Sequence, residues 1–139
     1  MSSVEAERER YKAFMAGSDT PGPVVMINLL RYRQQAEYPA GFDAEPCSGR
    51  EAYKRYSAAA FPMIQESGGR VVYWGEVQAS VIAPAGEEWD DAFLVEYPNR
   101  QAMLSAVGAP EYRAIVPHRT AALSDSRLIA TRQRDSTEK

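Results

Sequence analysis

The chain contains a single histidine, His118, and an arginine follows it directly. Histidine is the side chain whose ordinary pKa lies nearest neutral pH, so His118 is the first candidate for a general acid or base. Arg119 would then hold an anionic or enolate oxygen beside it. Because Pro117 is expected to bend or end a helix just before this pair, we expect His118 at the rim of a pocket rather than in the apolar core. The simpler interpretation is a polar helix end without chemistry.

A carboxylate beside His118 would orient the imidazole and raise its pKa, whereas burial would lower that pKa. The segment EEWDD, residues 87–91, supplies carboxylates, and Asp90 is the best candidate for this second catalytic role. Neighbouring residues of a strand point to opposite faces, so a metal site is not expected in this segment. A solvated hairpin tip is the simpler interpretation of it.

Other side chains are candidates for binding a ligand. Asn28 interrupts an apolar segment, and a buried amide needs hydrogen-bond partners. A satisfied core amide and a donor that points into a binding site fit this position equally well. Arg31 is a candidate for anion binding, although such a residue is more often on the surface. Five aromatic residues could line a pocket, although their default role is core packing: Tyr53, Tyr56, Trp74, Tyr97 and Tyr112. Of these, Tyr53, Trp74 and Tyr97 are the predicted ligand contacts.

The sequence lacks the motifs of several common kinds of site. There is no GxSxG, no phosphate-binding glycine loop, no GxGxxG and no HExxH. The sequence therefore argues against a serine hydrolase, a nucleotide-binding protein and a zinc protease. Cys47 is the only cysteine, which excludes an internal disulfide and a cysteine-based zinc cluster. We expect neither a cofactor nor a metal.

Composition narrows the class of protein. The chain has 139 residues, of which 45% are hydrophobic, so one domain with a full core is expected over 1–139. The net charge is −3 without a basic block, which argues against nucleic acid as a partner. No segment approaches the roughly 20 apolar residues of a membrane span, and the charged start lacks the apolar run of a secretory signal. We expect a cytoplasmic protein.

The first half of the chain is predicted to begin with a helix at 3–16, capped by Ser2 and Glu5, which with a linker makes up residues 1–22. The apolar run 24–32 favours a strand that is buried on both faces. A long loop follows at 33–47, and long loops are often functional. Ser48 then caps an amphipathic helix that contains Pro62 and ends at Gly68 and Gly69.

The second half is predicted to contain a long strand at 70–84, with a bulge at Gly75, and a returning strand at 89–98. Asn99 is a good cap for the next helix, and Pro110 is a favoured first residue of another. A last strand covers 126–132, and residues 133–139 form a flexible polar tail.

This order of elements indicates an α+β fold. After the first helix it is strand, helix, strand, strand, helix, strand, the split βαβ order of a ferredoxin-like fold with a four-stranded antiparallel sheet. The two major helices would cover one face of the sheet, yet the strands are apolar on both faces. The extra N-terminal helix would cover part of the second face, and a second copy of the sheet would cover it better. We therefore expect a homodimer.

The chain also resembles a known family. The segments PVVMINLLRYR, GREAYKRYSAAAFPMI, EEWDDAFLVEYPNRQAM and PEYRAIVPHRTAALSDSRLI are similar to the domain-of-unknown-function family 1330, over residues 23–131. That family belongs to the dimeric α+β barrel superfamily. The resemblance implies a ferredoxin-like subunit and a homodimer whose two sheets form a barrel, and it implies no established reaction.

Together these observations predict a homodimeric α+β barrel that binds a small, partly aromatic or carbonyl-bearing molecule between its sheet and helices. If it is an enzyme, the superfamily suggests cofactor-independent proton transfer or oxygenation. The alternatives are a non-catalytic ligand-binding or sensor module, and a purely structural dimer.

Overall fold

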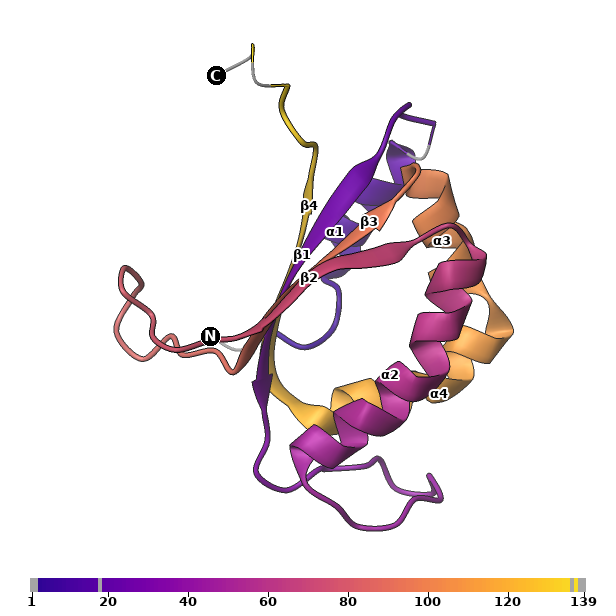
Figure 1. Cartoon of the computed structure of the whole chain (residues 1–139). Coiled ribbons are helices and arrows are strands. Elements are labelled where there is room, and N and C mark those ends of the chain that lie inside the picture. The colour runs from indigo at the N-terminus through magenta and orange to yellow at the C-terminus, as the bar shows by residue number, and fades with distance from the viewer. Residues whose placement is uncertain (1–2, 18, 136, 138–139) are drawn as a thin grey trace.

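A computed structural model describes residues 3–17, 19–135 and 137 of the chain. Its elements are, in order, α1 (Arg8–Ala16), β1 (Val24–Tyr32), α2 (Gly49–Glu66), β2 (Arg70–Glu76), β3 (Asp91–Tyr97), α3 (Arg100–Gly108), α4 (Pro110–Ala122) and β4 (Leu123–Thr131). The strands form one sheet in the order β2-β3-β1-β4, and all three pairings are antiparallel. With α2, α3 and α4 on one face of that sheet (Figure 1), the predicted ferredoxin-like α+β fold is confirmed.

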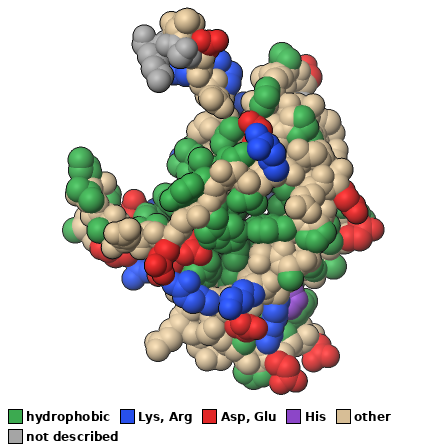
Figure 2. Space-filling view, viewed as in Figure 1, with side chains coloured by type: hydrophobic (Ala, Val, Ile, Leu, Met, Phe, Trp, Pro, Cys, Tyr) green, Lys and Arg blue, Asp and Glu red, His purple; other side chains and the backbone are tan. Residues whose placement is uncertain are grey.

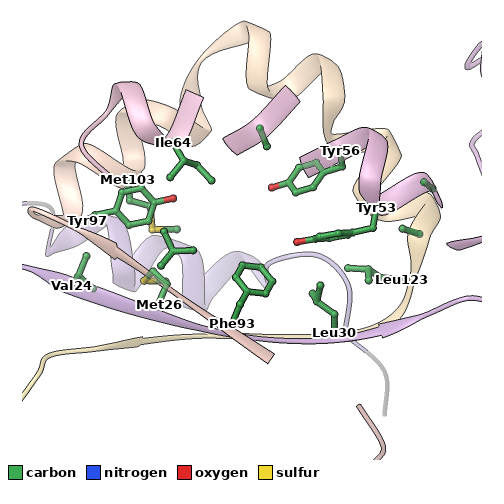
Figure 3. Packing of buried hydrophobic residues seen from close by; sticks show 14 residues of the cluster. Val24, Met26, Leu30, Tyr53, Tyr56, Ile64, Phe93, Tyr97, Met103 and Leu123 are labelled. Carbon is green, nitrogen blue, oxygen red and sulfur yellow. The ribbon is translucent and has the colours of Figure 1, made fainter. Parts of the chain in front are cut away.

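The core lies between the sheet and the helices. Alternate residues of β1 point toward the helices and are buried, from Val24 to Leu30, while the residues between them are half-buried. The same alternation buries Phe93, Val95 and Tyr97 of β3. Figure 3 shows these side chains meeting those of α2 in one layer. This is the period of two that a strand with one covered face requires.

Two predicted helix caps, Ser48 and Asn99, are confirmed, but the first helix begins at Arg8 rather than at residue 3. The Ser48 hydroxyl accepts a hydrogen bond from the Glu51 amide at 3.1 Å, and the Asn99 side chain accepts one from the Ala102 amide at 2.8 Å. Gly17 ends α1. The capping residue of α1 in the structure is Glu7, and the predicted cap Ser2 lies outside the described residues.

Two prolines lie inside helices. Pro62 is within α2, as predicted, but Pro117 does not end α4, which continues through His118 to Ala122. Proline removes one backbone hydrogen bond, and the helix tolerates this loss because it packs along α2.

The N-terminal segment lies on the same side of the sheet as the other helices. Val4 and Phe14 pack against the core. The Val4 carbonyl accepts a hydrogen bond from Arg119 of α4 at 2.7 Å, and the Ser3 carbonyl accepts one from the buried Ser126 hydroxyl at 2.7 Å. The prediction that this helix would cover part of the opposite face is therefore wrong.

The predicted strand over 70–84 is too long. β2 ends at Glu76, its register shifts between Val71 and Tyr73 rather than at Gly75, and residues 77–90 form an arm that leaves the sheet (Figure 1). Alternating apolar residues continue into the arm, but no strand lies beside them to accept their backbone hydrogen bonds in the described chain.

No helix covers the second face of the sheet in the described part of the chain (Figure 1), and this face is apolar at its centre. The register aligns one residue from each strand across this face: Tyr73, Leu94, Ile27 and Ile129. Tyr73 is 58% exposed and Ile129 is 48% exposed. The Arg70–Glu96 ion pair flanks this row on one side. We call this surface the open face.

Among the described residues, no helix is long and apolar enough to cross a membrane.

Candidate functional site

The space between sheet and helices contains a group of tyrosines. Figure 3 shows the hydroxyl ends of Tyr53 and Tyr56, from α2, and of Tyr97, from β3, pointing toward one region above Phe93. All three residues are at least 95% buried. The Tyr56 hydroxyl is 2.6 Å from the hydroxyl of Tyr112 on α4. We call Tyr53, Tyr56, Tyr97 and Tyr112 the tyrosine cluster.

Burial raises the pKa of Tyr53, Tyr56 and Tyr97 above the ordinary value, and the neighbouring Tyr112 adds to this shift in the pKa of each. These phenols are therefore protonated at neutral pH and act as hydrogen-bond donors rather than as bases. The Arg119 guanidinium, which donates to the Val4 carbonyl, is close enough to the Tyr53 phenol for its charge to oppose the rise in the Tyr53 pKa. A phenol and a guanidinium thus lie together at the inner side of α4.

Asn28 lies on the inner face of β1, opposite Phe93 of β3, and is 9% exposed. Its side-chain nitrogen donates to the Met26 carbonyl at 3.2 Å. That bond satisfies part of the buried amide, so the core role and the ligand-binding role both remain consistent with its position.

A second polar group lies where β3 begins. The Asp91 carboxylate accepts a hydrogen bond from the Tyr32 hydroxyl at 2.8 Å and another from the Trp74 indole nitrogen at 3.1 Å. The Arg50 guanidinium lies 4.8 Å from the centre of the Tyr32 ring, and that ring is 5.7 Å from the ring of Tyr53. Arg50 is exposed and Trp74 is 38% exposed. We call Tyr32, Arg50, Trp74 and Asp91 the mouth of the interior.

The mouth and the tyrosine cluster are continuous. Asp91 is among the charges that raise the pKa of Tyr53, and burial and the Asp91 bond raise the pKa of Tyr32. Trp74 stacks on Phe93 with ring centres 4.2 Å apart, and Phe61 of α2 packs against both rings. Figure 2 shows hydrophobic atoms exposed in a recess between β2 and α2, with basic side chains below it.

Asp90 does not orient His118. Its carboxylate accepts a hydrogen bond from the Tyr32 amide at 2.8 Å and lies 3.8 Å from the Arg50 guanidinium. Its own amide donates to the Leu30 carbonyl. Asp90 therefore fixes the end of β1 beside the mouth, and the predicted pairing with His118 is wrong.

His118 has a different set of neighbours, on the outer side of the helices. Its Nδ1 is 2.7 Å from the hydroxyl of Tyr38, which belongs to the 33–47 loop. The rings of Tyr38 and Phe42 are stacked, and both meet the imidazole edge-on. Arg55 of α2 donates to the Tyr38 hydroxyl at 3.2 Å. We call Tyr38, Phe42, Arg55 and His118 the histidine cluster.

The pKa of His118 is lowered from its ordinary value, first because burial disfavours the charged ring and second because Arg55 is nearby. This direction is the one that burial alone was expected to give. Cys47 is close enough to Tyr38 to be among the groups that raise the pKa of Tyr38, after burial as the main cause. The histidine is half-buried, and it lies beneath the loop rather than at the opening of the interior.

Arg31 is exposed. It lines a shallow, open polar hollow with Gln34, Gln35 and Asp125, among others. The structure separates it from the tyrosine cluster because its side chain follows the outward direction of the strand end.

The structure thus brings together four of the predicted ligand contacts, Tyr53, Tyr97, Trp74 and Arg119, with Asn28 on the strand below them. It separates His118 and Arg31 from this group. Sequence reasoning missed Asp91, Tyr32 and Arg50. A signal for Asp91 existed, because it has the same odd-numbered register as Phe93, Val95 and Tyr97, whose side chains face the core.

The interior can donate hydrogen bonds to an oxygen through the Tyr53 phenol and the Arg119 guanidinium, and it can accept one at Asp91. Aromatic and aliphatic side chains form the rest of its wall. In the described residues, no three His, Cys, Asp or Glu side chains are grouped to hold a metal ion.

Comparison with known proteins gives a family but no activity. No curated protein matches the chain. The crystal structure of RPA0582, a protein of unknown function from Rhodopseudomonas palustris, is 35% identical, covers 97% of this chain and 99% of that chain, and has a TM-score of 0.88. A crystal structure of the methylated RPA0582 protein is 36% identical, with 97% of each chain covered and a TM-score of 0.89.

A more distant structure is that of a dimeric protein of unknown function with a ferredoxin-like fold from Bacteroides fragilis. It is 15% identical, with a TM-score of 0.49, and the match covers 79% of this chain and 95% of that chain. The model of the domain of unknown function DUF1330 matches residues 47–132, which contain the whole tyrosine cluster, Arg119 and most of the mouth. The chain belongs to the DUF1330 family.

Proposed function

We propose that this protein binds a small organic molecule in the interior between its sheet and helices, and that it does so as a homodimer. The ligand has an aromatic or apolar body and one carbonyl, enolate or carboxylate oxygen. The observation that carries the proposal is the meeting of buried tyrosine hydroxyls with Arg119 in an otherwise apolar interior.

A purely structural core does not account for this arrangement well. Each buried hydroxyl costs free energy on desolvation, on the order of 1–3 kcal/mol where it is left unpaired. Phenylalanine would fill the same volume without that cost. A guanidinium in an interior can hold a carboxylate or an enolate oxygen, and Arg119, which also donates to the Val4 carbonyl, has the Tyr53 phenol near it.

Access to the interior is through the mouth. Trp74 and Arg50 are the more exposed of its residues, and Phe61 with Trp74 lies between solvent and Phe93. A ligand would displace these rings by changes of rotamer and would then meet the tyrosine cluster. Arg50 lies outside Tyr32 and favours the approach of an anionic ligand.

The homodimer is supported by the open face. Its central row of apolar side chains spans all four strands, and a surface of this kind is normally covered by another protein surface. A second copy of the open face is self-complementary about a two-fold axis. The ion pair beside the row, Arg70 with Glu96, would lie in the polar rim that such interfaces have.

Native mass spectrometry of the untreated protein tests for a co-purified ligand, and thermal shift with benzoate, salicylate and phenylpyruvate tests the chemical class. We expect at least one of these aromatic acids to raise the melting temperature, with a rise that grows with the logarithm of its concentration above Kd. The variant Tyr53→Phe should weaken that binding at least tenfold. Tyr73→Phe, which removes a hydroxyl from the open face, is the matched control and should leave it unchanged. Equal binding by wild type and Tyr53→Phe would refute the interior site.

A catalytic version of this function is cofactor-independent proton transfer. It is favoured by one observation: the acceptor Asp91 is bonded to the Tyr32 hydroxyl, and the Tyr32 ring lies 5.7 Å from the ring of Tyr53. A substrate whose oxygen is held by Tyr53 and Arg119 would then present its acidic C–H to Asp91. Nuclear magnetic resonance in D₂O would show exchange of the methylene protons of phenylpyruvate above the uncatalysed rate, and Asp91→Asn would abolish the excess. Binding without exchange identifies the non-catalytic ligand-binding or sensor module.

A further inference from the structure

The arm, residues 77–90, carries apolar side chains that the described part of its own chain leaves almost uncovered. Val81 is 89% exposed and Ile82 is 97% exposed, the two highest values among the exposed large hydrophobic residues. Hydrophobic side chains also appear at the end of the arm in Figure 2. Single exposed apolar residues are common, but two β-branched residues side by side on a protruding segment are typical of a contact with another molecule.

The structure holds the arm in a defined direction. At its base the Val77 amide donates to the Asp90 carbonyl at 2.8 Å, and near its tip the Glu87 amide donates to the Pro84 carbonyl at 3.1 Å. Arg127 of β4 pairs with Glu87 at 3.4 Å and lies 5.0 Å from the centre of the Trp89 ring. These contacts join the returning half of the arm to the strand at the opposite edge of the sheet.

The arm projects on the side of the open face. In Figure 1 the helices lie on one side of the sheet and the arm extends from the other. Arg127 pairs in register with Leu29 of β1, whose side chain belongs to the open face. A molecule seated on the open face would therefore lie next to the arm.

We propose that the arm clasps a second copy of this chain, with Val81 and Ile82 packing on the partner subunit when the two open faces meet. This inference rests on the homodimer of the proposed function. The arm and the open face lie on the same side of one chain, so in a two-fold dimer the arm of each subunit contacts the open face of the other. A partner of a different sequence would leave one arm and one acceptor surface without a contact, so the second copy is the favoured occupant.

Isotope-resolved photo-crosslinking tests the clasp. A photoreactive benzoylphenylalanine is placed at position 82, and at position 129 on the open face as a second probe, in a mixture of ¹⁴N-labelled and ¹⁵N-labelled protein. The clasp predicts crosslinked peptides of mixed isotope composition from both positions. Mixed crosslinks from position 129 without any from position 82 would overturn the clasp and leave the homodimer intact. A chain that sediments as a monomer at about 100 μM, roughly a hundredfold above the Kd of a micromolar complex, would overturn both the clasp and the homodimer. Ligand binding in the interior would be unaffected by that result and is tested separately.

Substitutions in the arm measure how much it contributes to the stability of the dimer. Val81→Ser combined with Ile82→Ser should raise the dimer dissociation constant at least tenfold in sedimentation equilibrium, while Ala85→Ser, at another exposed position of the arm, should leave it unchanged. Because both replaced side chains are exposed in the single chain, the fold is not expected to change, and circular dichroism checks this. An unchanged dissociation constant would refute the clasp, and a monomer whose position 82 crosslinks to phosphatidylglycerol vesicles would identify a membrane surface as the occupant instead.

Discussion

Gly49 is the position at which the structure makes its sharpest prediction about stability. It is the first residue of α2 and is buried where the 33–47 loop meets the junction of α4 and β4. A Cβ atom at this position would meet the Arg33 carbonyl oxygen, the Ala122 carbonyl oxygen at 2.6 Å and the Arg33 amide nitrogen at 2.8 Å. All three are backbone atoms, so a change of rotamer cannot relieve the contacts.

The size of the effect follows from the contacts that must shift. Overpacking costs about 1–3 kcal/mol. Two backbone hydrogen bonds are disturbed, one from the Arg33 amide to the Ala122 carbonyl at 2.8 Å and one from the Gly49 amide to the Arg33 carbonyl at 3.1 Å, at about 0.5–1.5 kcal/mol each. The better helix propensity of alanine returns at most ~1 kcal/mol. We expect Gly49→Ala to lower the free energy of unfolding by about 1–5 kcal/mol.

Urea denaturation followed by tryptophan fluorescence measures this change, at one fixed protein concentration because a dimer's stability depends on it. A chain of this size loses roughly 3–4 °C of melting temperature per kcal/mol. The control is Gly108→Ala, where no heavy atom lies within 4 Å of the added Cβ, so that variant should be as stable as wild type or more stable by up to ~1 kcal/mol. If Gly49→Ala came within ~0.5 kcal/mol of wild type, the close approach of loop, helix and junction would be wrong.

Two further predictions concern the clusters. Because the folded pKa of His118 lies below its unfolded value of about 6.5, its contribution to stability is complete above pH 6.5 and is lost as the pH falls through the folded pKa. The imidazole should therefore titrate below 6.5 by nuclear magnetic resonance, and a midpoint at or above 6.5 would contradict this. Arg55→Met should move the midpoint only part of the way back, since burial is the larger cause of the lowered pKa. The Tyr56 and Tyr112 hydroxyls are 2.6 Å apart, and removing either one should lower the free energy of unfolding by about 1–2 kcal/mol. In a double-mutant cycle, the variant with both Tyr56→Phe and Tyr112→Phe should lose about 1 kcal/mol less than the sum of the two single losses. Strictly additive losses of stability would show that the two hydroxyls are not coupled.

Sequence alone determined the order of the elements. The apolar run of β1, the caps Ser48 and Asn99 and the helix-starting Pro110 are local signals, and local signals fix local structure. The alternation of residues 91–97 places Phe93, Val95 and Tyr97 on one side of the strand, and the structure shows that this side faces the core. The sequence also indicated that the second face of the sheet needs a cover, because the predicted strands are apolar on both faces.

Tertiary structure decided which side chains meet. The partner of His118 is Tyr38, which is 80 residues away in sequence, and the loop that carries it has no periodicity from which its path could be inferred. Asp90 and Asp91 are adjacent, yet the pleat turns Asp91 toward Tyr32 and Trp74 and leaves Asp90 to bind the end of β1. Likewise, β2 ends at Glu76 because no strand of the described sheet pairs with the residues that follow. Strand pairing of this kind is not visible in the sequence of β2 itself. Pairing and contact are long-range, and this is why the sequence indicated some residues of the candidate site, such as Tyr53 and Trp74, but neither Asp91 nor the arrangement of the group.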